Sequence, residues 1–177
     1  NVYVMINFDL TKIKALAFDI DGVLSTNIVR MENDGAGLMR TANIKDGYAL
    51  QLAVKCGLQL AIVTGGNSEA IRNRYEQLGV QHIFQRAAVK INVFRDWCAQ
   101  IEVQPQDVLY MGDDIPDFEV MKECGLPVCP ADAAAEIKAI ATYVSHLPGG
   151  CGCVRDVIEQ VLKAQNHWMS SARAFGW

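Results

Sequence analysis

The chain has 177 residues, which is enough for one well-buried core and too few for two ordinary domains. Hydrophobic residues make up 51% of it, yet no apolar stretch approaches the roughly 20 residues that a membrane span needs. The net charge is -4 without a long run of Lys or Arg. Nucleic acid is therefore not an expected partner, because affinity for it comes mainly from clustered basic side chains.

The cysteines are scattered along the chain, most of them in apolar surroundings where free Cys behaves as a small hydrophobe. No charged region followed by an apolar signal segment is visible near the first residue. We therefore expect a cytoplasmic protein with reduced thiols. Cys151-Gly152-Cys153 lacks the two-residue spacer of common zinc knuckles, so a metal or redox role for this pair is an alternative that we do not favour.

Short apolar runs alternate with helical patterns. In chain order we expect strands at Ala15–Phe18, Leu58–Val63, His82–Phe84 and Val108–Met111, and a final central strand at Val128–Cys129. Between and after them we expect helices at Gly47–Lys55, from Ser68 to about Leu78, between Val89 and Ile101, at Pro116–Lys122, and near Ala133–Ile140 and Val154–Leu162. Near-continuous apolar strands separated by helices predict an α/β fold, a doubly wound parallel sheet covered on both faces and without a cap domain.

One stretch, at about residues 23–46, breaks this alternation. Asn27–Glu32 and Leu38–Asn43 flank Asn33-Asp34-Gly35, which is a strong hairpin signal. The hairpin would stand above the end of the first strand as a flap. Because it is too small to seal a site alone, we expect a neighbouring subunit to cover the opening. A surface hairpin without a role is the alternative.

We expect residues 1–177 to form a single domain that ends in a tail at about residues 165–177. The tail carries Trp168, Phe175 and Trp177. These apolar side chains predict either a disordered segment or one that docks on another chain.

Two clusters of carboxylates directly follow buried strands. Asp19 and Asp21 follow the first strand, and Asp113, Asp114 and Asp117 follow Val108–Met111. Ligands bind at the carboxyl ends of parallel strands, near the point where the strand order reverses. Two acidic clusters side by side would repel each other unless a cation lay between them. The sequence therefore predicts a hard, oxygen-preferring metal, with Mg2+ as the first candidate.

A carboxylate beside Mg2+ can attack phosphorus and form an aspartyl-phosphate. Asp19 is the better nucleophile candidate because it comes first off the strand. Asp21 is placed to act as general acid and then as base for the attacking water. Thr64 and Gly65 offer a hydroxyl and backbone N–H groups to a phosphate, and Lys90 offers a positive charge.

Each of these motifs has a plain structural alternative when it is taken alone. Asp-x-Asp-Gly occurs in calcium loops and turns, and Thr64-Gly65-Gly66 occurs in turns. Lys90 could be a solvated helix residue, and the cluster from Asp113 to Asp117 could cap a helix. Their order along the chain and their shared edge of the sheet favour the catalytic interpretation.

These four segments, in this order, resemble the haloacid dehalogenase superfamily of phosphatases from Ala15 to about Ile140. The resemblance implies that Asp19 is the nucleophile and Asp21 the acid/base, and that Thr64 and Lys90 bind the transferring phosphoryl group. It also implies that Asp19, the Asp21 main-chain carbonyl and Asp113 bind Mg2+. Asp114 and Asp117 would orient the metal shell and Lys90.

The hairpin, Asn43–Tyr48, Val63-Thr64-Gly65 and Gly149–Arg155 resemble, more narrowly, the 3-deoxy-D-manno-octulosonate-8-phosphate phosphatases within this superfamily. That resemblance implies a cytoplasmic, Mg2+-dependent homotetramer of lipopolysaccharide sugar synthesis. The hairpins would pack between subunits, and a neighbour's C-terminal segment would help to close the site. For substrate binding we expect Lys45, Gly65, Gly66 and Arg72, with Arg155 reaching in from a neighbour.

Three positions depart from the family's pattern. Gly66 stands where the family often has Arg, Thr26 where it often has Asp, and Arg86 where it often has Gly. Arg72 or Arg86 is the expected substitute for the missing charge. The phosphoryl-transfer residues are unchanged, so a phosphatase of a nine-carbon 2-keto-3-deoxy sugar acid 9-phosphate stays an alternative.

A signalling receiver domain is a remote alternative, since it also uses a strand-end Asp, Mg2+, Thr and Lys. Receivers usually carry adjacent acidic residues on the first strand, whereas this chain has Asp19-x-Asp21. Its second acidic cluster also follows Lys90 instead of preceding it. A catalytically silent assembly subunit is disfavoured by the intact Asp19 and Asp21.

Overall fold

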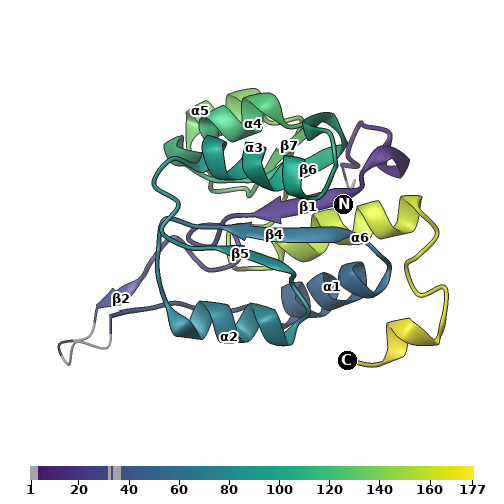
Figure 1. Ribbon diagram of the computed structural model, residues 1–177, viewed down its shortest axis with the longest axis horizontal. Helices are drawn as coiled ribbons and strands as arrows, with labels where there is room; N and C mark the ends of the chain where they lie inside the picture. Colours follow the sequence, from purple (N-terminus) through teal and green to yellow (C-terminus); the bar gives the residue numbers. More distant parts are fainter. Residues whose placement is uncertain (1–3, 32, 34–36) are drawn as a thin grey trace.

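A six-stranded parallel sheet forms the centre of the molecule in a computed structural model that describes residues 4–31, 33 and 37–177 (Figure 1). Its strand order is β5-β4-β1-β6-β7-β8, with β1 inside the sheet. The strands are Ala15–Phe18 (β1), Gln59–Val63 (β4), His82–Phe84 (β5), Val108–Met111 (β6), Leu126–Cys129 (β7) and Tyr143–Val144 (β8).

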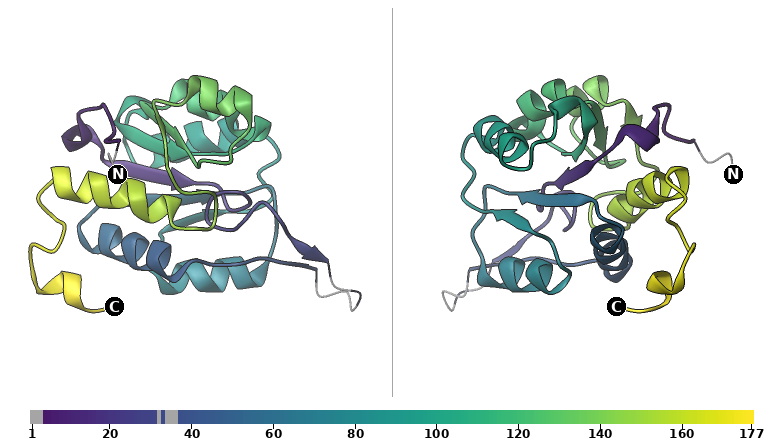
Figure 2. Two further views of the ribbon diagram at one scale, coloured as in Figure 1. Left: turned by 180° about the vertical axis from the view of Figure 1, so that it is seen from behind. Right: turned by 45° about the vertical axis from the view of Figure 1, so that its right-hand side comes forward.

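Helices cover both faces of this sheet, and each face has its own apolar core (Figures 1 and 2). One face is covered by α1 (Ile44–Lys55), α2 (Glu69–Gln77) and α6 (Cys153–Ala164); the other is covered by α3 (Lys90–Gln100), α4 (Phe118–Glu123) and α5 (Ala135–Ile140). Successive side chains of β1 alternate between the two cores, with Leu16 and Phe18 in one and Ala15 and Ala17 in the other. The predicted doubly wound α/β fold is confirmed.

The sheet register aligns the strand ends that carry the polar residues. Phe18 of β1 lies opposite Ile62 of β4 and Met111 of β6. The chain leaves β1 toward β4 and β5, then crosses back to β6 on the other side of β1. The strand order therefore reverses at β1, where α/β sheets bind their ligands.

The long elements were predictable to within a few residues, and the differences have local causes. α1 begins at Ile44 instead of Gly47, because the Asn43 side chain accepts hydrogen bonds from the N–H groups of Lys45 and Asp46 as an N-cap. The predicted helix at Pro116–Lys122 divides into a 3-10 turn at Ile115–Asp117 and α4. None of the helices in the described ranges has both the length and the hydropathy to cross a bilayer.

The sheet has one strand more than expected. Val128–Cys129, the expected final central strand, belongs to β7, which begins two residues earlier at Leu126, and β8 follows at its outer edge. β8 has only two residues, and two residues are too few to give a periodic pattern.

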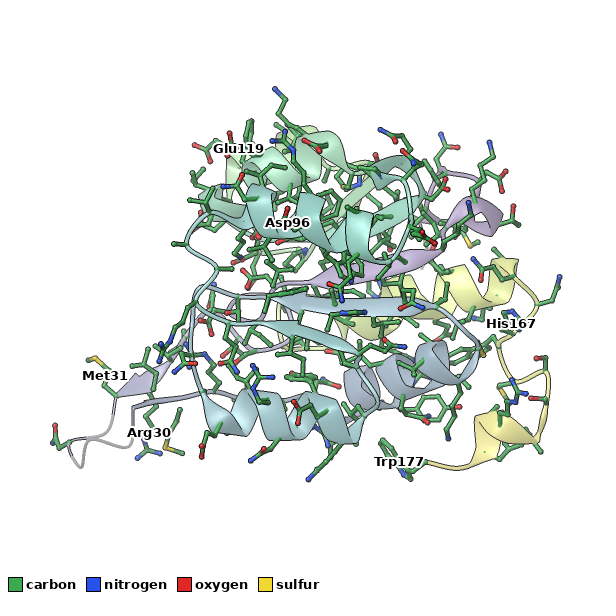
Figure 3. All side chains as sticks on the ribbon, viewed as in Figure 1. Arg30, Met31, Asp96, Glu119, His167 and Trp177 are labelled. Atoms are coloured by element: carbon green, nitrogen blue, oxygen red, sulfur yellow. The ribbon has the colours of Figure 1, made fainter. Side chains whose placement is uncertain are left out.

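The expected flap is an antiparallel hairpin of β2 (Arg30–Met31) and β3 (Leu38–Met39) that projects from the body of the molecule (Figure 1). The Asp34-Gly35 part of the predicted turn lies outside the described residues. Figure 3 shows Arg30 and Met31 on this projection, away from the sheet.

The C-terminal tail packs on its own chain, which corrects the expectation of a disordered segment or one docked elsewhere. Trp168 and Trp177 make edge-to-face contacts with Tyr48 of α1, with ring centroids 6.0 and 6.2 Å apart. The Lys55 Nζ donates to the Gly176 carbonyl at 3.2 Å. Tyr48 provides the aromatic surface that these tail residues cover. Figure 2 shows the C-terminal segment beside α1.

Candidate active site

Three carboxylates from the two acidic segments meet at the carboxyl edge of the sheet. Asp19 follows β1, and Asp113 and Asp117 follow β6; each offers an oxygen within 4.8 Å of the other two. The parallel pairing of β1 with β6 places the segments side by side, and the Asp19 N–H donates to the Met111 carbonyl at 3.1 Å. The predicted convergence of the two clusters is therefore present in the structure.

Two glycines allow the carboxylates to come this close. A Cβ on Gly22 would lie 1.9 Å from the Asp113 Oδ2, and the φ of Gly22 is +83°. A Cβ on Gly112 would lie 2.4 Å from the Asp117 Cβ and Cγ. Any side chain at either position would displace an acidic residue of the cluster.

Lys90, the first residue of α3, lies between two of the carboxylates. Its Nζ is 2.6 Å from the Asp19 Oδ2 and 2.8 Å from the Asp117 Oδ1. The Tyr110 hydroxyl donates to the same Asp117 Oδ1 at 2.7 Å, and the Asp113 N–H donates to the Asp117 Oδ2 at 3.1 Å. Asp117 is fully buried, so its carboxylate depends on these donors.

Asp114 is the member of the second cluster that caps a helical turn. Its side chain accepts from the Ile115 N–H at 2.8 Å and forms a capping box with Asp117. The helix-capping alternative is thus correct for Asp114, while Asp113 and Asp117 turn toward Asp19.

The cluster carries more negative charge than Lys90 can balance. Burial, and then the charge of Asp117, raise the pKa of Asp19 against the opposing effect of Lys90. Burial, followed by Asp117 and Asp114, raises the pKa of Asp113 to about 7. For Lys90, burial alone would lower the pKa, but Asp117 and Asp19 raise it, so this side chain stays protonated. Three close carboxylate oxygens with uncompensated charge fit a hard divalent cation.

Thr64 directly follows β4, the strand beside β1, and lines the same pocket as Asp19 and Asp113. It is buried, and its Oγ1 accepts from the Gly66 N–H at 3.2 Å. The loop after β5 is tied to it, because the Arg86 N–H donates to the Gly66 carbonyl and the Ala87 N–H to the Thr64 carbonyl, both at 3.0 Å. Arg86 has φ +57°, a left-handed conformation that suits the glycine often found there in the family.

Asp21 has a partner that the sequence did not indicate. Arg40, just after β3 of the flap, donates from Nε to the Asp21 Oδ1 at 2.6 Å and from Nη2 to the Asp21 Oδ2 at 2.9 Å. Hydrogen bonding to Asp21 is the largest cause of a raised pKa for Arg40, to which the charge of Asp19 also contributes. Arg40 and Asn27 line the same pocket as Asp19, Thr64 and Lys90.

A family model of haloacid dehalogenase-like hydrolases matches residues 43–131. The chain belongs to the haloacid dehalogenase-like hydrolase family. Two relatives named 3-deoxy-D-manno-octulosonate 8-phosphate phosphatase KdsC, from Salmonella typhi and Escherichia coli K12, are each 37% identical over 86% of this chain and 81% of the relative.

Solved structures of similar hydrolases share the fold. A 3-deoxy-D-manno-octulosonate 8-phosphate phosphatase from Yersinia pestis has a TM-score of 0.86 at 33% identity, covering 90% of this chain and 85% of that chain. The enzyme of that name from Moraxella catarrhalis, in complex with a magnesium ion, a phosphate ion and KDO, has a TM-score of 0.86 at 31% identity, covering 89% of this chain and 90% of that chain.

The residues expected to bind substrate in this hydrolase divide into two groups. Gly65 and Gly66 line the pocket that holds Asp19. Lys45 and Arg155 lie instead along a separate cavity beside α6, and Arg72 is exposed on α2 with its Nη1 3.2 Å from the Glu76 Oε1.

Arg155 is engaged within its own chain. Its guanidinium carbon lies 4.6 Å from the Trp168 ring centroid and 5.3 Å from that of Tyr48. Its Nε donates to Glu159 at 2.8 Å. Its reach into a neighbouring subunit stays a prediction.

Arg40 is the charged site residue of this hydrolase that sequence reasoning missed, beside the uncharged Asn27 and Tyr110. The side chain nearest to Gly66 is that of Arg40, with Nη2 3.0 Å from the position of a Cβ there. Arg72 and Arg86, the two candidates for the charge missing at Gly66, are not among the residues that line the active-site pocket. The available signal was an isolated Arg directly after the apolar Leu38-Met39.

Proposed function

We propose that this protein is an Mg2+-dependent phosphomonoesterase that hydrolyses 3-deoxy-D-manno-octulosonate 8-phosphate to the free sugar acid and phosphate. Such an activity serves lipopolysaccharide sugar synthesis in the cytoplasm. The observation that carries the proposal is the cluster of the buried Asp19, Asp117 and Lys90 with the half-buried Asp113 at the sheet edge. It occurs in a chain that is 37% identical to phosphatases of that name over most of its length.

Asp19 and Asp113, with the main-chain carbonyl of Asp21, would hold Mg2+. The uncompensated negative charge of the cluster supports this assignment. Asp117 is bonded to Lys90 and Tyr110, and Asp114 caps the following turn, which supports orienting roles for both. A bound Mg2+ would offset the repulsion between the nucleophile and the phosphate dianion.

In the first chemical step the Asp19 carboxylate attacks phosphorus, and the bond from phosphorus to the ester oxygen breaks. Asp21 gives its proton to the departing sugar oxygen. The Thr64 hydroxyl, the Gly65 N–H and the Lys90 ammonium stabilise charge on the non-bridging oxygens. Asp21 then takes a proton from water, which attacks the aspartyl-phosphate, releases phosphate and restores Asp19.

The eight-carbon sugar acid 8-phosphate is the first candidate substrate, because the relatives that are 37% identical to this chain are phosphatases of that ester. The nine-carbon 9-phosphate is the second candidate substrate. Gly66, Thr26 and Arg86 depart from the family's pattern, so both esters are compared in the test. Gly65 and Gly66 would contact the substrate from the pocket wall. Lys45, Arg72 and Arg155 could contribute only through another subunit or a rearrangement.

We further propose that residues 1–177 act as one phosphatase domain and assemble as a homotetramer. Ile28 and Met31 of the flap are 77% and 81% exposed, and Leu38 and Met39 are also exposed. An apolar projection of this kind is costly in water unless another surface covers it. A neighbouring subunit at the flap would also close the catalytic pocket.

The test is phosphate release from the eight- and nine-carbon keto-acid phosphates with Mg2+, by the natural chain and by Asp19→Asn. The variant keeps the shape of the side chain but has no nucleophilic carboxylate, so turnover should fall by at least about 10^4-fold. Asp96→Asn, on the exposed side of α3 (Figure 3), is the matched control and should stay active.

Multiple turnover also distinguishes this function from a receiver domain, which would keep a phosphoryl group without releasing sugar acid repeatedly. Preference for the nine-carbon ester would move the assignment to the second candidate. Full turnover by Asp19→Asn would remove Asp19 from the mechanism.

A further inference from the structure

Arg40 brings a partly buried positive charge from the flap into the catalytic pocket. Its side chain is 11% exposed, whereas that of its partner Asp21 is 39% exposed. The guanidinium uses Nε and Nη2 against both oxygens of Asp21, at 2.6 and 2.9 Å. This is the two-point geometry in which Arg binds carboxylates and phosphates most strongly.

The same guanidinium lies beside the phosphoryl-binding loop. Its Nη2 is 3.0 Å from the position of a Cβ on Gly66, and the Thr64 Oγ1 is 3.5 Å from that position. The backbone of Gly66 does not have a positive φ, so its conformation does not require glycine. The missing side chain instead leaves room for Arg40.

The arrangement conflicts with the part that Asp21 plays in the proposed reaction. An Asp21 carboxyl that carries the proton for the departing ester oxygen cannot keep both of these hydrogen bonds, because its hydroxyl oxygen is a poor acceptor. A phosphate dianion beside Thr64 would offer the guanidinium a second acceptor of matching fork geometry and higher charge. The Nε–Nη2 edge of Arg40 can hold Asp21 or the phosphate in this two-point geometry, but not both at once.

We propose that Arg40 is a phosphoryl-binding residue that exchanges its partner, holding Asp21 in the free enzyme and the phosphoryl oxygens in the complex. The exchange frees Asp21 for the leaving oxygen when substrate is bound. This inference rests on the proposed phosphatase function and adds a residue of the flap to it. It predicts that phosphate and Asp21 compete for one guanidinium.

The test is calorimetric binding of inorganic phosphate, in Mg2+, to four forms of the full chain: natural, Arg40→Met, Asp21→Asn and the double variant. Arg40→Met should weaken phosphate binding by at least about 10-fold, since hydrogen bonds between charged groups are among the strongest in proteins. Asp21→Asn should tighten binding, because the neutral amide competes less for Arg40.

The decisive quantity is the coupling between the two positions. Removing the Asp21 charge also relieves its direct repulsion of phosphate, and this gain persists in the Arg40→Met background. The tightening caused by Asp21→Asn should therefore be at least about 5-fold larger with Arg40 present than in the Arg40→Met background, a coupling of about 1 kcal/mol. An equal tightening in both backgrounds would overturn the exchange.

Two further variants serve as controls for the binding measurement. Arg40→Lys keeps the charge without the fork and should bind phosphate with intermediate affinity, even if Arg40→Met unfolds the flap. Arg95→Met removes an Arg that is also forked on a carboxylate, Glu123, with nitrogen-to-oxygen distances of 2.6 to 3.0 Å, but lies outside the pocket of Asp19. It should bind phosphate as the natural chain does.

The outcomes separate the inference from the function on which it rests. If the natural chain releases phosphate from its ester but Arg40→Met and Arg40→Lys bind phosphate unchanged, the exchange is wrong and the phosphatase assignment stands. If the natural chain releases no phosphate from either ester, the phosphatase assignment itself is wrong.

Discussion

Lys90 is the residue on which the electrostatics of the site depend most. It is buried and bonded to Asp19 and Asp117, and its charge opposes the rise in the pKa of Asp19. Removing one member of a buried ion pair leaves uncompensated charge, which typically costs about 3–5 kcal/mol. An exposed pair contributes about 0–1 kcal/mol, because water already solvates its charges.

Lys90→Met should therefore lower the free energy of unfolding by about 3–5 kcal/mol in Mg2+-free buffer and abolish phosphatase turnover. Denaturant unfolding measures the first effect. Lys14→Met is the control: Lys14 lies 2.7 Å from Asp107 but is 65% exposed, so its loss should cost less than about 1 kcal/mol. Equal losses from the two variants would contradict the role of Lys90.

Gly22 and Gly57 form a matched pair of glycines. Both have a left-handed φ, +83° and +90°, but a Cβ on Gly22 would collide with Asp113, whereas one on Gly57 would meet nothing within 4 Å. Alanine should cost about 1–2 kcal/mol of backbone strain at either position. Only Gly22→Ala should also weaken Mg2+ activation of phosphate release, by at least about 10-fold. Similar Mg2+ titration curves for both variants would rule out the packing argument.

At the scale of elements, the sequence predicted what depends on continuous burial. The strands Ala15–Phe18 and Val108–Met111 are apolar throughout and were located to the residue, and the carboxylates after them meet because parallel strands share an edge. β8 is too short for a pattern. Arg40 reaches Asp21 only through the fold of the flap, a contact between residues 19 positions apart that no local periodicity encodes.

The α1–α6 contact contains a titratable group that should affect stability. The Asp46 Oδ1 accepts from the Arg155 N–H at 2.7 Å in the first turn of α6, and burial raises the pKa of Asp46 from 3.8 to about 6. Between about pH 4 and pH 6 the folded state therefore binds more protons than the unfolded state, so stability falls as the pH rises through this range.

Asp46→Asn should remove this contribution. The free energy of unfolding of the natural chain, relative to the variant, should fall by about 2–3 kcal/mol between pH 4 and pH 6 and then level off. Urea unfolding at a series of pH values gives the two curves. Parallel curves over that range would show that Asp46 keeps an ordinary pKa in the folded protein.

At the scale of the whole molecule, the flap is the part that a single chain leaves uncovered. A second copy of the chain packed on the hairpin, as proposed above, would cover its exposed apolar residues and close the pocket that Asn27 and Arg40 line. The sequence indicated the hairpin through its turn signal, but it could not indicate that the C-terminal tail would pack on α1 of its own chain. That contact depends on Tyr48, far away in the sequence.

Sedimentation should show an assembly larger than a monomer for the natural chain. The double variant Met31→Glu, Met39→Glu should dissociate it and lower kcat/KM while leaving the far-ultraviolet circular dichroism unchanged. Val144→Glu, on the edge strand β8, is a control that should keep the assembly. A monomeric and fully active natural chain would contradict closure of the site by a neighbour.

The most direct measurement is to capture the phosphoryl group on Asp19. An aryl phosphate with a leaving group that needs no proton is mixed with the Asp21→Asn variant and Mg2+, quenched in acid during turnover, and the peptides are weighed by mass spectrometry. Without the base that activates water, the intermediate should accumulate, and the peptide containing Asp19 should carry one phosphoryl group. A phosphoryl group on another residue, or none while phosphate is still released, would contradict the mechanism.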